Sequence, residues 1–379
     1  MMTGPRYFPI LDALRFLACM CVFMAHSVTF FNFSGIRLSF PLFMEDAGYF
    51  GVVFFYTLSG FLITYLLLKE KENSGTIAVM DFYVRRALRI WPLYYAIILL
   101  SFFVFPNLLR GHPVQGIGDW PVPFLLYLLM LPNLAMFGGY YLATCYHTYT
   151  IGFEEQFYLF WPLFVRKAGG RAGYVLAVLF ALPWALDLLR VRLMPGGLPI
   201  SLNGANLGRG VLIFISLSNI PAFIAGAAAA WLYLKSGRKF RAIAGNRIWR
   251  LALAGAVLFL MCCTVPEGPG YVNGVSVIFA LLILNLAWSE GGGGWIGAVL
   301  VRGGRISYGI YIYHVAVFIA VSIGMKRAHV VFPGRPMLTY LLYVLASLIL
   351  LLLVSAVSYR YFEQYFLRKK KRFRPIPEN

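Results

Sequence analysis

The chain of 379 residues carries 33 lysines and arginines against 14 acidic residues, a formal net charge of +19. Hydrophobic residues make up 60% of it and charged residues only 12%, about half the share of roughly 25% found in soluble domains. This composition excludes a soluble globular exterior and a disordered chain. The basic residues stand in short segments between apolar runs, which indicates membrane topology signals and no nucleic-acid partner. We expect an all-α integral membrane protein embedded in a lipid bilayer.

Ten segments are apolar and long enough to cross a bilayer as helices, which takes about 20 residues. The expected spans are 10–31, 49–68, 88–105, 150–165, 173–189, 211–234, 250–265, 271–289, 306–325 and 337–361. The segment 122–137 is apolar but short, and Pro123 and Pro132 interrupt it. We expect a re-entrant or interfacial helix there, covered by other parts of the protein. The pattern predicts one transmembrane domain over 1–365 and a basic cytoplasmic tail over 366–379.

The distribution of lysine and arginine predicts the orientation, because these residues concentrate in cytoplasmic connections. Placing the N- and C-termini in the cytoplasm assigns most of the 33 basic residues to inner connections. Counting 122–137 as a full span would move the basic tail outside. The first span contains Asp12 and Arg15 and lacks a cleavage pattern, which favours a retained helix over a signal peptide. The five cysteines show no disulfide framework or metal-ligand spacing, and no metal is expected.

Arg15 and His26 are the polar residues of interest in the first span, since ionisable residues within lipid are costly. His26 follows Arg15 by about three helical turns, so both share one helix face, roughly 16 Å apart along the axis. In the expected orientation Arg15 lies toward the cytoplasm and His26 toward the outer leaflet. A purely structural interpretation is also open: Arg15 could pair with Asp12 or reach the inner headgroups, and His26 could be a hydrogen-bonded packing residue.

Arg86 and Arg89 open the third span from its cytoplasmic end, within the segment FYVRRALRIWPLYY. They are about one helical turn apart and point to similar faces. Two guanidinium groups at this position suit phosphate binding, because each can donate two hydrogen bonds to phosphate oxygens. The alternative is plain topological anchoring, which accounts for the neighbouring Arg85. Arg89 lies deeper and fits that alternative less well.

A third polar group enters the fourth span from the outside. His147 and Glu154 are seven residues apart, near one face if the segment is helical. Glu154 and Glu155 are expensive in lipid unless they are paired or protonated. A structural ion pair inside the bundle is the alternative to a functional role.

Two further polar positions lie near the C-terminal end. His314 stands mid-span beside several tyrosines, an arrangement more typical of a hydrogen-bonded core residue. Arg360 and Glu363, where the last span ends, are spaced to form an ion pair one helical turn apart. The roles of His147 and His314 stay open.

Taken in order, these segments form a recognisable set. The segments are LDALRFLACMCVFMAH (11–26), GVVFFYTLSGFLI (51–63), RRALRIWPLYY (85–95), TIGFEEQFYLFWPL (150–163), ISYGIYIYH (306–314) and YRYFE (359–363). The chain resembles the membrane-bound acyltransferase 3 family, whose members O-acylate bacterial surface polysaccharides and related glycans with acyl-CoA. Arg15 and His26 match that family's R-x10-H first helix, and Arg86 and Arg89 its R-x-x-R pair. The set departs from the family where Val53 replaces an aspartate and where Tyr-Thr-Ile over 149–151 replaces Trp-Ser-Leu.

The resemblance implies an enzyme of the bacterial inner membrane that uses acyl-CoA, in the first instance acetyl-CoA, as co-substrate. Arg86 and Arg89 would bind the donor's phosphates, with the thioester arm extending along the face of Arg15. His26 would act as general base on a hydroxyl of a cell-surface glycan or lipid-linked saccharide, as in exopolysaccharide biosynthesis. Glu154 would orient the acceptor or hold an arginine. We expect no additional extracytoplasmic domain of the kind that some relatives carry.

Two other classes of protein remain as alternatives. A transporter or flippase for a glycan or lipid-linked sugar would also need many spans and intramembrane charge. The lack of a visible inverted repeat and the arginine pair at the inner face speak against it. A non-catalytic membrane subunit is the other, and it would tolerate loss of Arg15 and His26.

Overall fold

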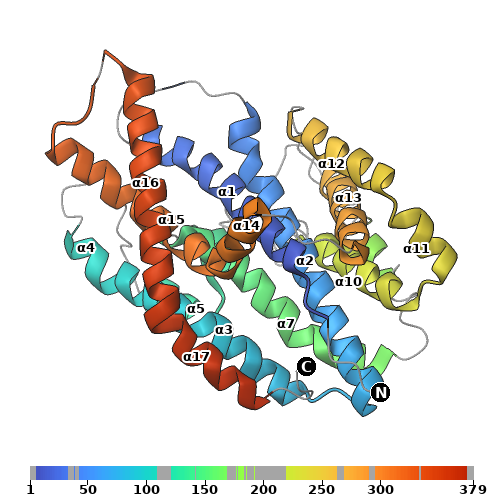
Figure 1. Cartoon of the computed structure of the whole chain (residues 1–379). Helices are drawn as coiled ribbons and strands as arrows, with labels where there is room; N and C mark the ends of the chain where they lie inside the picture. The colour runs from blue at the N-terminus through green and yellow to red at the C-terminus, as the bar shows by residue number, and fades with distance from the viewer. Residues whose placement is uncertain are drawn as a thin grey trace.

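The computed structural model describes residues 6–32, 38, 42–108, 121–140, 142–168, 219–262, 269–289, 295–332 and 334–373, with isolated positions 176, 178–182, 185 and 192. All regular structure in these residues is helical, which confirms the expected all-α class (Figure 1). The expected span 173–189 lies mostly outside the described residues. The basic tail is described only as far as Phe373.

The helices follow the chain as a series of long rods joined by short helical pieces. The α-helices are α1 (Pro9–Asn32), α2 (Leu42–Ser74), α3 (Val79–Leu99), α4 (Phe105–Leu108), α5 (Pro121–Leu128), α6 (Pro132–Phe137), α7 (Tyr149–Ala168), α10 (Ile220–Lys235), α11 (Arg238–Ala244), α12 (Arg247–Cys262), α13 (Pro269–Trp288), α14 (Trp295–Arg305), α15 (Ser307–Arg327), α16 (Pro336–Ser358) and α17 (Gln364–Lys369). Two π turns, η1 (Leu100–Val104) and η4 (Tyr359–Glu363), and two 3-10 turns, η2 (Tyr146–Thr148) and η5 (Lys370–Phe373), join them.

Five helical stretches of the described chain are long and apolar enough to cross a membrane. They are Pro9–Phe31, Asp46–Ser74, Val79–Leu108, Ser307–Arg327 and Pro336–Lys369, and each contains or overlaps one of the expected spans. The α11–α12 pair, bent by 49°, would make six if it counts as one span. Helices α7, α10 and α13 occupy three further expected positions without meeting the same criterion. The total of ten spans and the orientation of the termini therefore stay predictions.

The central pair of the bundle is α2 and α10, and glycine lets them approach closely. A Cβ atom on Gly60 of α2 would overlap the backbone carbonyl of Phe223, and one on Gly226 of α10 would overlap that of Thr57. Small residues are enriched where membrane helices pack backbone to backbone. This crossing fixes the position of α2, which supplies one wall of the cavity described below.

Replacing Gly226 with alanine should therefore destabilise the protein, because the new methyl group has no space without moving α2 from α10. Overpacking of this kind typically costs about 1–3 kcal/mol. The matched control is Gly255→Ala in α12, where a Cβ meets nothing within 4 Å and alanine favours the helix by up to about 1 kcal/mol. Thermal unfolding of both variants in detergent checks this. A Gly226→Ala melting temperature equal to that of wild type would contradict the close crossing.

The interrupted segment 122–137 forms two short helices, α5 and α6, neither long enough to span a membrane. The break falls at Met130, whose backbone has a positive φ of 60°, just before the proline that starts α6. The hydroxyls of Tyr94 and Tyr95 on α3 donate to the carbonyls of Tyr127 and Leu128, at 2.8 and 2.9 Å. These two bonds attach the segment to α3, while Leu125 and Leu129 stay exposed, and a re-entrant or interfacial position stays a prediction.

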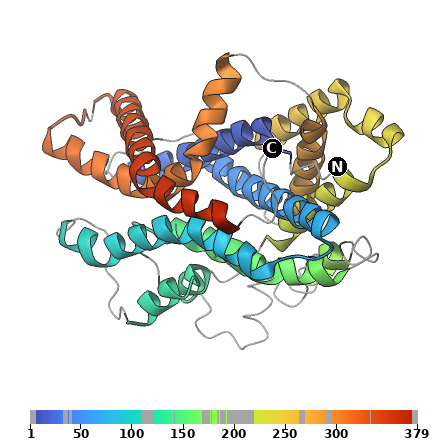
Figure 2. The same ribbon diagram turned by 60° about the horizontal axis from the view of Figure 1, so that its bottom comes forward.

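The elements that build the functional site converge from distant parts of the sequence. Helices α3 and α7 contact each other, and α7 also contacts α2 (Figures 1 and 2). Helix α16 continues through η4 into α17, which lies against α3 (Figure 1). Helix α1 contacts α2, α14 and α15. These elements together line the cavity described below.

Candidate active site

A cavity of about 410 Å³ lies among these elements. Its walls come from the start of α1, the middle of α2, the first half of α3, the first half of α7, the α14–α15 junction and the η4–α17–η5 segment. Arg6 and Lys370, near the two ends of the described chain, both line it. Residues at opposite ends of the sequence therefore share one site.

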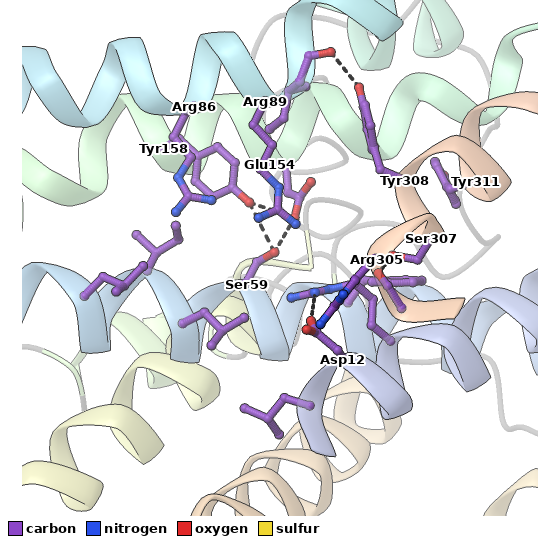
Figure 3. A pocket seen from close by; sticks show the side chains of 18 of the residues that line it. Asp12, Ser59, Arg86, Arg89, Glu154, Tyr158, Arg305, Ser307, Tyr308 and Tyr311 are labelled. Carbon is purple, nitrogen blue, oxygen red and sulfur yellow. Dashed lines mark hydrogen bonds and ion pairs between the residues drawn. The ribbon is translucent and has the colours of Figure 1, made fainter. Parts of the chain in front are cut away.

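Arg86 and Arg89 extend from α3 into this cavity, as their spacing predicts (Figure 3). The guanidinium of Arg86 lies over the rings of Phe82 and Tyr158, 5.5 and 5.6 Å from their centroids. Its Nε is buried without a hydrogen-bond partner. Among the described residues, neither Arg86 nor Arg89 forms a hydrogen bond or an ion pair. Both guanidiniums therefore retain donors for a bound anion.

Arg85, the neighbour of this pair, has a different role. Its guanidinium pairs with the carboxylate of Glu70 at 3.1 Å and donates to the carbonyl of Phe373 at 2.5 Å. It joins α3 to α2 and to η5. Its side chain is thus a link between elements of the fold, and its part in membrane topology stays a prediction.

Glu154 also lines the cavity, and its partners are hydroxyl groups. Ser59 of α2 and Tyr158 of α7 both donate to its Oε1, the latter at 2.9 Å (Figure 3). The Tyr158 hydroxyl is also 3.2 Å from that of Ser59. Glu154 forms no ion pair with an arginine within the described chain. The expected role of holding an arginine therefore has no support in these contacts. Glu155 points elsewhere and accepts from Trp91 Nε1 at 3.0 Å.

Arg15 forms the ion pair with Asp12 that the sequence allowed, and both side chains line the cavity. Asp12 also accepts a hydrogen bond from the Tyr7 hydroxyl at 2.6 Å. Burial and the Asp12 carboxylate raise the pKa of Tyr7 above its ordinary value, which keeps that phenol a donor. The carboxylate is thus satisfied from two sides, and it holds Arg15 against the wall of the cavity.

Basic residues outnumber acidic ones around this space. The cationic side chains are Arg6, Arg15, Arg86, Arg89, Arg305 and Lys370, and the acidic ones are Asp12, Glu154 and Glu363. A concave site with excess positive charge in a poorly solvated environment attracts polyanions. The arrangement suits a ligand with several phosphates.

His26 does not line this cavity. It lies in a second polar group, here termed the histidine cluster, which consists of His26 of α1, His147 of η2 and His314 of α15. His26 Nδ1 is 2.6 Å from His314 Nε2, and the two rings stack at 4.9 Å with an interplanar angle of 4°. The ring of His147 meets that of His314 edge-on at 4.7 Å. Arg15 and His26 share one helix, but only Arg15 faces the cavity.

Tyr311 and Thr150 separate the cavity from the histidine cluster. Both residues line the cavity, and their hydroxyls are 2.5 Å apart. The Tyr311 hydroxyl also donates to the backbone carbonyl of His147 at 2.8 Å. The ring centroid of Tyr311 is 5.7 Å from that of His314. Tyr311 is therefore the wall that divides the basic cavity from the three imidazoles.

Sequence patterns did not single out several residues of this site. Ser59 stands in an apolar run, and the YTLSGF motif that contains it gave no reason to select its hydroxyl. Tyr158 follows Glu154 by one helical turn and could have been found from that spacing. Within the described chain, no group of three or more His, Cys, Asp or Glu side chains could hold a metal ion.

The described chain is all-helical, with helices that could cross a membrane, and its cavity is lined mainly by basic side chains. An acyltransferase domain profile matches residues 8–360. The chain belongs to this acyltransferase family.

Among curated proteins, the chain is similar to a putative O-acetyltransferase of Staphylococcus aureus strain COL, 24% identical over 96% of this chain and 58% of the relative. It is also similar to the peptidoglycan O-acetyltransferase OatA of Listeria monocytogenes, 30% identical over 42% of this chain and 24% of the relative. A putative peptidoglycan O-acetyltransferase of Bacillus subtilis, YrhL, is 28% identical over 51% of this chain and 30% of the relative. The matches span less than two thirds of the length of these relatives. No solved structure matches the chain.

Proposed function

We propose that the protein transfers an acyl group, in the first instance acetyl, from acyl-CoA to a hydroxyl of a cell-surface glycan or lipid-linked saccharide. It would act in the bacterial inner membrane, with both termini in the cytoplasm and ten spans. The observation that carries the proposal is the basic cavity, in which Arg86 and Arg89 hold their guanidiniums without an acceptor among the described residues. The names of the relatives, which include peptidoglycan O-acetyltransferases, support a glycan acceptor.

In this proposal the donor enters the cavity from the cytoplasm. Arg86 and Arg89 bind its phosphates, because guanidinium forks match phosphate oxygens. The thioester arm then extends past Arg15 toward Tyr311. The cavity and the histidine cluster meet at Tyr311 and Thr150, so displacement of these hydroxyls would bring the thioester carbonyl to the imidazole of His26.

His26 then serves as general base. The acceptor hydroxyl gives its proton to the imidazole while its oxygen forms a bond to the thioester carbonyl carbon. The carbon–sulfur bond breaks, and the CoA thiolate takes the proton from the imidazolium as it leaves. The products are the O-acyl glycan and free CoA, so no further reactant is required. Glu154, which accepts hydrogen bonds from Ser59 and Tyr158, would orient the acceptor.

The test is acyl transfer by the purified full-length protein in detergent, with radiolabelled acetyl-CoA and soluble peptidoglycan fragments as the acceptor probe. We expect label in the fragments together with release of free CoA thiol. A flippase would leave the acetyl-CoA intact under these conditions. Absence of both label transfer and thiol release, with protein that is folded by its melting curve, would refute the enzyme and favour transport.

A further inference from the structure

The histidine cluster contains a hydrogen-bond arrangement that fixes where the protons lie. His314 has a partner at each ring nitrogen: Nε2 faces His26 Nδ1 at 2.6 Å, and Nδ1 faces the backbone carbonyl of Tyr311 at 2.6 Å. A carbonyl oxygen only accepts, so His314 Nδ1 carries a proton and donates it there. A neutral imidazole has one N–H, and His314 Nε2 is therefore a lone-pair acceptor.

The hydrogen bond between the rings of His26 and His314 then shows which nitrogen of His26 carries the proton. Since His314 Nε2 accepts, the donor must be the Nδ1–H of His26. The Nε2 of His26 is left unprotonated, with a lone pair, which is the form that a general base needs. The partner of one ring nitrogen sets the tautomer of a histidine in this way.

We propose that His314 is a positioning residue that holds His26 in the tautomer with Nδ1 protonated and Nε2 free to accept the proton of the acceptor hydroxyl. This inference rests on the proposed function, in which His26 is the general base. It assigns a role to a buried histidine that lies 288 residues away in the sequence. His314 touches neither substrate, and it acts only through His26.

The opposite direction of the hydrogen bond is disfavoured by the surroundings of His314. It would require a doubly protonated His314, and no acidic side chain in the described part of the chain forms an ion pair with it. His314 is 1% exposed, and Ile310, Val315 and Phe318 around it are buried apolar residues. A buried charge without a partner is costly.

The third member of the cluster stands outside this chain of hydrogen bonds. His147 Nε2 contacts the carbonyl of Ile312 at 3.2 Å, so Nε2 is the protonated nitrogen. Its Nδ1 is buried without a hydrogen-bond partner. With only a lone pair on that side, His147 cannot donate to His26 or His314. It provides a matched control, a buried histidine in the same cluster with no part in the proton arrangement.

During the reaction the same hydrogen bond would stabilise the charge that forms on His26. When Nε2 takes the proton of the hydroxyl, the Nδ1–H bond to His314 becomes charge-assisted and stronger. The proton then passes from Nε2 to the sulfur of the leaving CoA. His314 keeps its own proton throughout.

Kinetics of three variants test the role of His314. His314→Leu should lower kcat by about 100-fold or more, because His26 is no longer held in the reactive tautomer, while KM for acetyl-CoA stays unchanged. His314→Gln retains an acceptor oxygen near the position of Nε2, so its kcat should be at least about tenfold higher than that of His314→Leu. His147→Gln should stay within about threefold of wild type. Equal activity of the Leu and Gln variants, or a His147→Gln loss as large as that of His314→Leu, would overturn the proposal.

Nitrogen NMR of histidine-labelled full-length protein in lipid vesicles reads the tautomer without depending on activity. His26 should show a protonated Nδ1 and an unprotonated Nε2, and His314→Leu should abolish that preference. An Nε2-protonated His26 in the wild-type protein would overturn the inference. The two experiments separate the two proposals. A fully active His26→Ala variant would refute the role of His26 as general base. The NMR measurement shows which nitrogen of His26 carries the proton, whatever the activity of the protein.

Discussion

Replacing His26 with alanine should abolish acyl transfer from acetyl-CoA while the protein remains folded in the membrane. A general base typically contributes a factor of 10²–10⁴, so we expect kcat to fall at least about 100-fold. KM for acetyl-CoA should change little, because His26 lies outside the basic cavity. Label transfer from acetyl-CoA to peptidoglycan fragments measures the first quantity, and a titration of initial rate against acetyl-CoA measures the second.

The control for this variant is His329→Asn. His329 is exposed in the turn just after α15, with a positive φ of 57° that asparagine tolerates better than most residues. It should keep wild-type activity. If His26→Ala also keeps wild-type activity, the general base lies elsewhere, and the histidine cluster is then only a packing feature.

The sequence predicts those parts of the site that depend on neighbours along one helix. Arg86 and Arg89 lie one turn apart on α3, so helical geometry alone places them together, and both enter the cavity. The Arg15–Asp12 pair follows from the same spacing. Local periodicity is reliable here because the helix has a fixed number of residues per turn.

Periodicity cannot show which helices become neighbours. His26 and His314 lie on separate helices, and nothing in either segment indicates that their rings stack. The same holds for Ser59, which becomes part of the site only because α7 brings Glu154 to it. Helical spacing put His26 and Arg15 on one helix face and so suggested one continuous site. In the structure, Tyr311 separates the cavity that Arg15 lines from the imidazole of His26.

A departure from α-helical geometry also misled the sequence interpretation of the last span. The expected ion pair between Arg360 and Glu363 is not formed. These residues lie in the π turn η4, which takes more residues per turn than an α-helix, so a spacing of three no longer aligns two side chains. Glu363 faces the cavity, where Ser358 donates to it at 3.3 Å, and Arg360 lies over the ring of Tyr361. π turns often mark functional positions, and this one supplies an acidic residue to the cavity.

Replacing Arg86 and Arg89 with glutamine should weaken binding of the donor far more than binding of the acceptor. Hydrogen bonds to charged groups contribute about 1.5–3 kcal/mol each, which corresponds to roughly a 10-fold to 100-fold rise in KM for acetyl-CoA per arginine. The acceptor KM should change little. Lysine at either position keeps the charge but loses the second donor of the fork, so we expect an intermediate KM.

The matched control is Arg360→Gln, which removes an exposed arginine that does not line the cavity and should leave the donor KM unchanged. Equilibrium binding of CoA itself, followed by calorimetry on the purified protein, separates binding from chemistry. The two cavity arginines have no hydrogen-bond acceptor within the described chain, and Arg86 loses only its contacts with the rings of Phe82 and Tyr158, so the melting temperature should fall only slightly. If CoA binds the Arg86→Gln, Arg89→Gln double variant as tightly as wild type, both residues serve only as topological anchors. It would also remove the main support for acyl-CoA as the donor, since Arg15, another basic residue of the cavity, is already paired with Asp12.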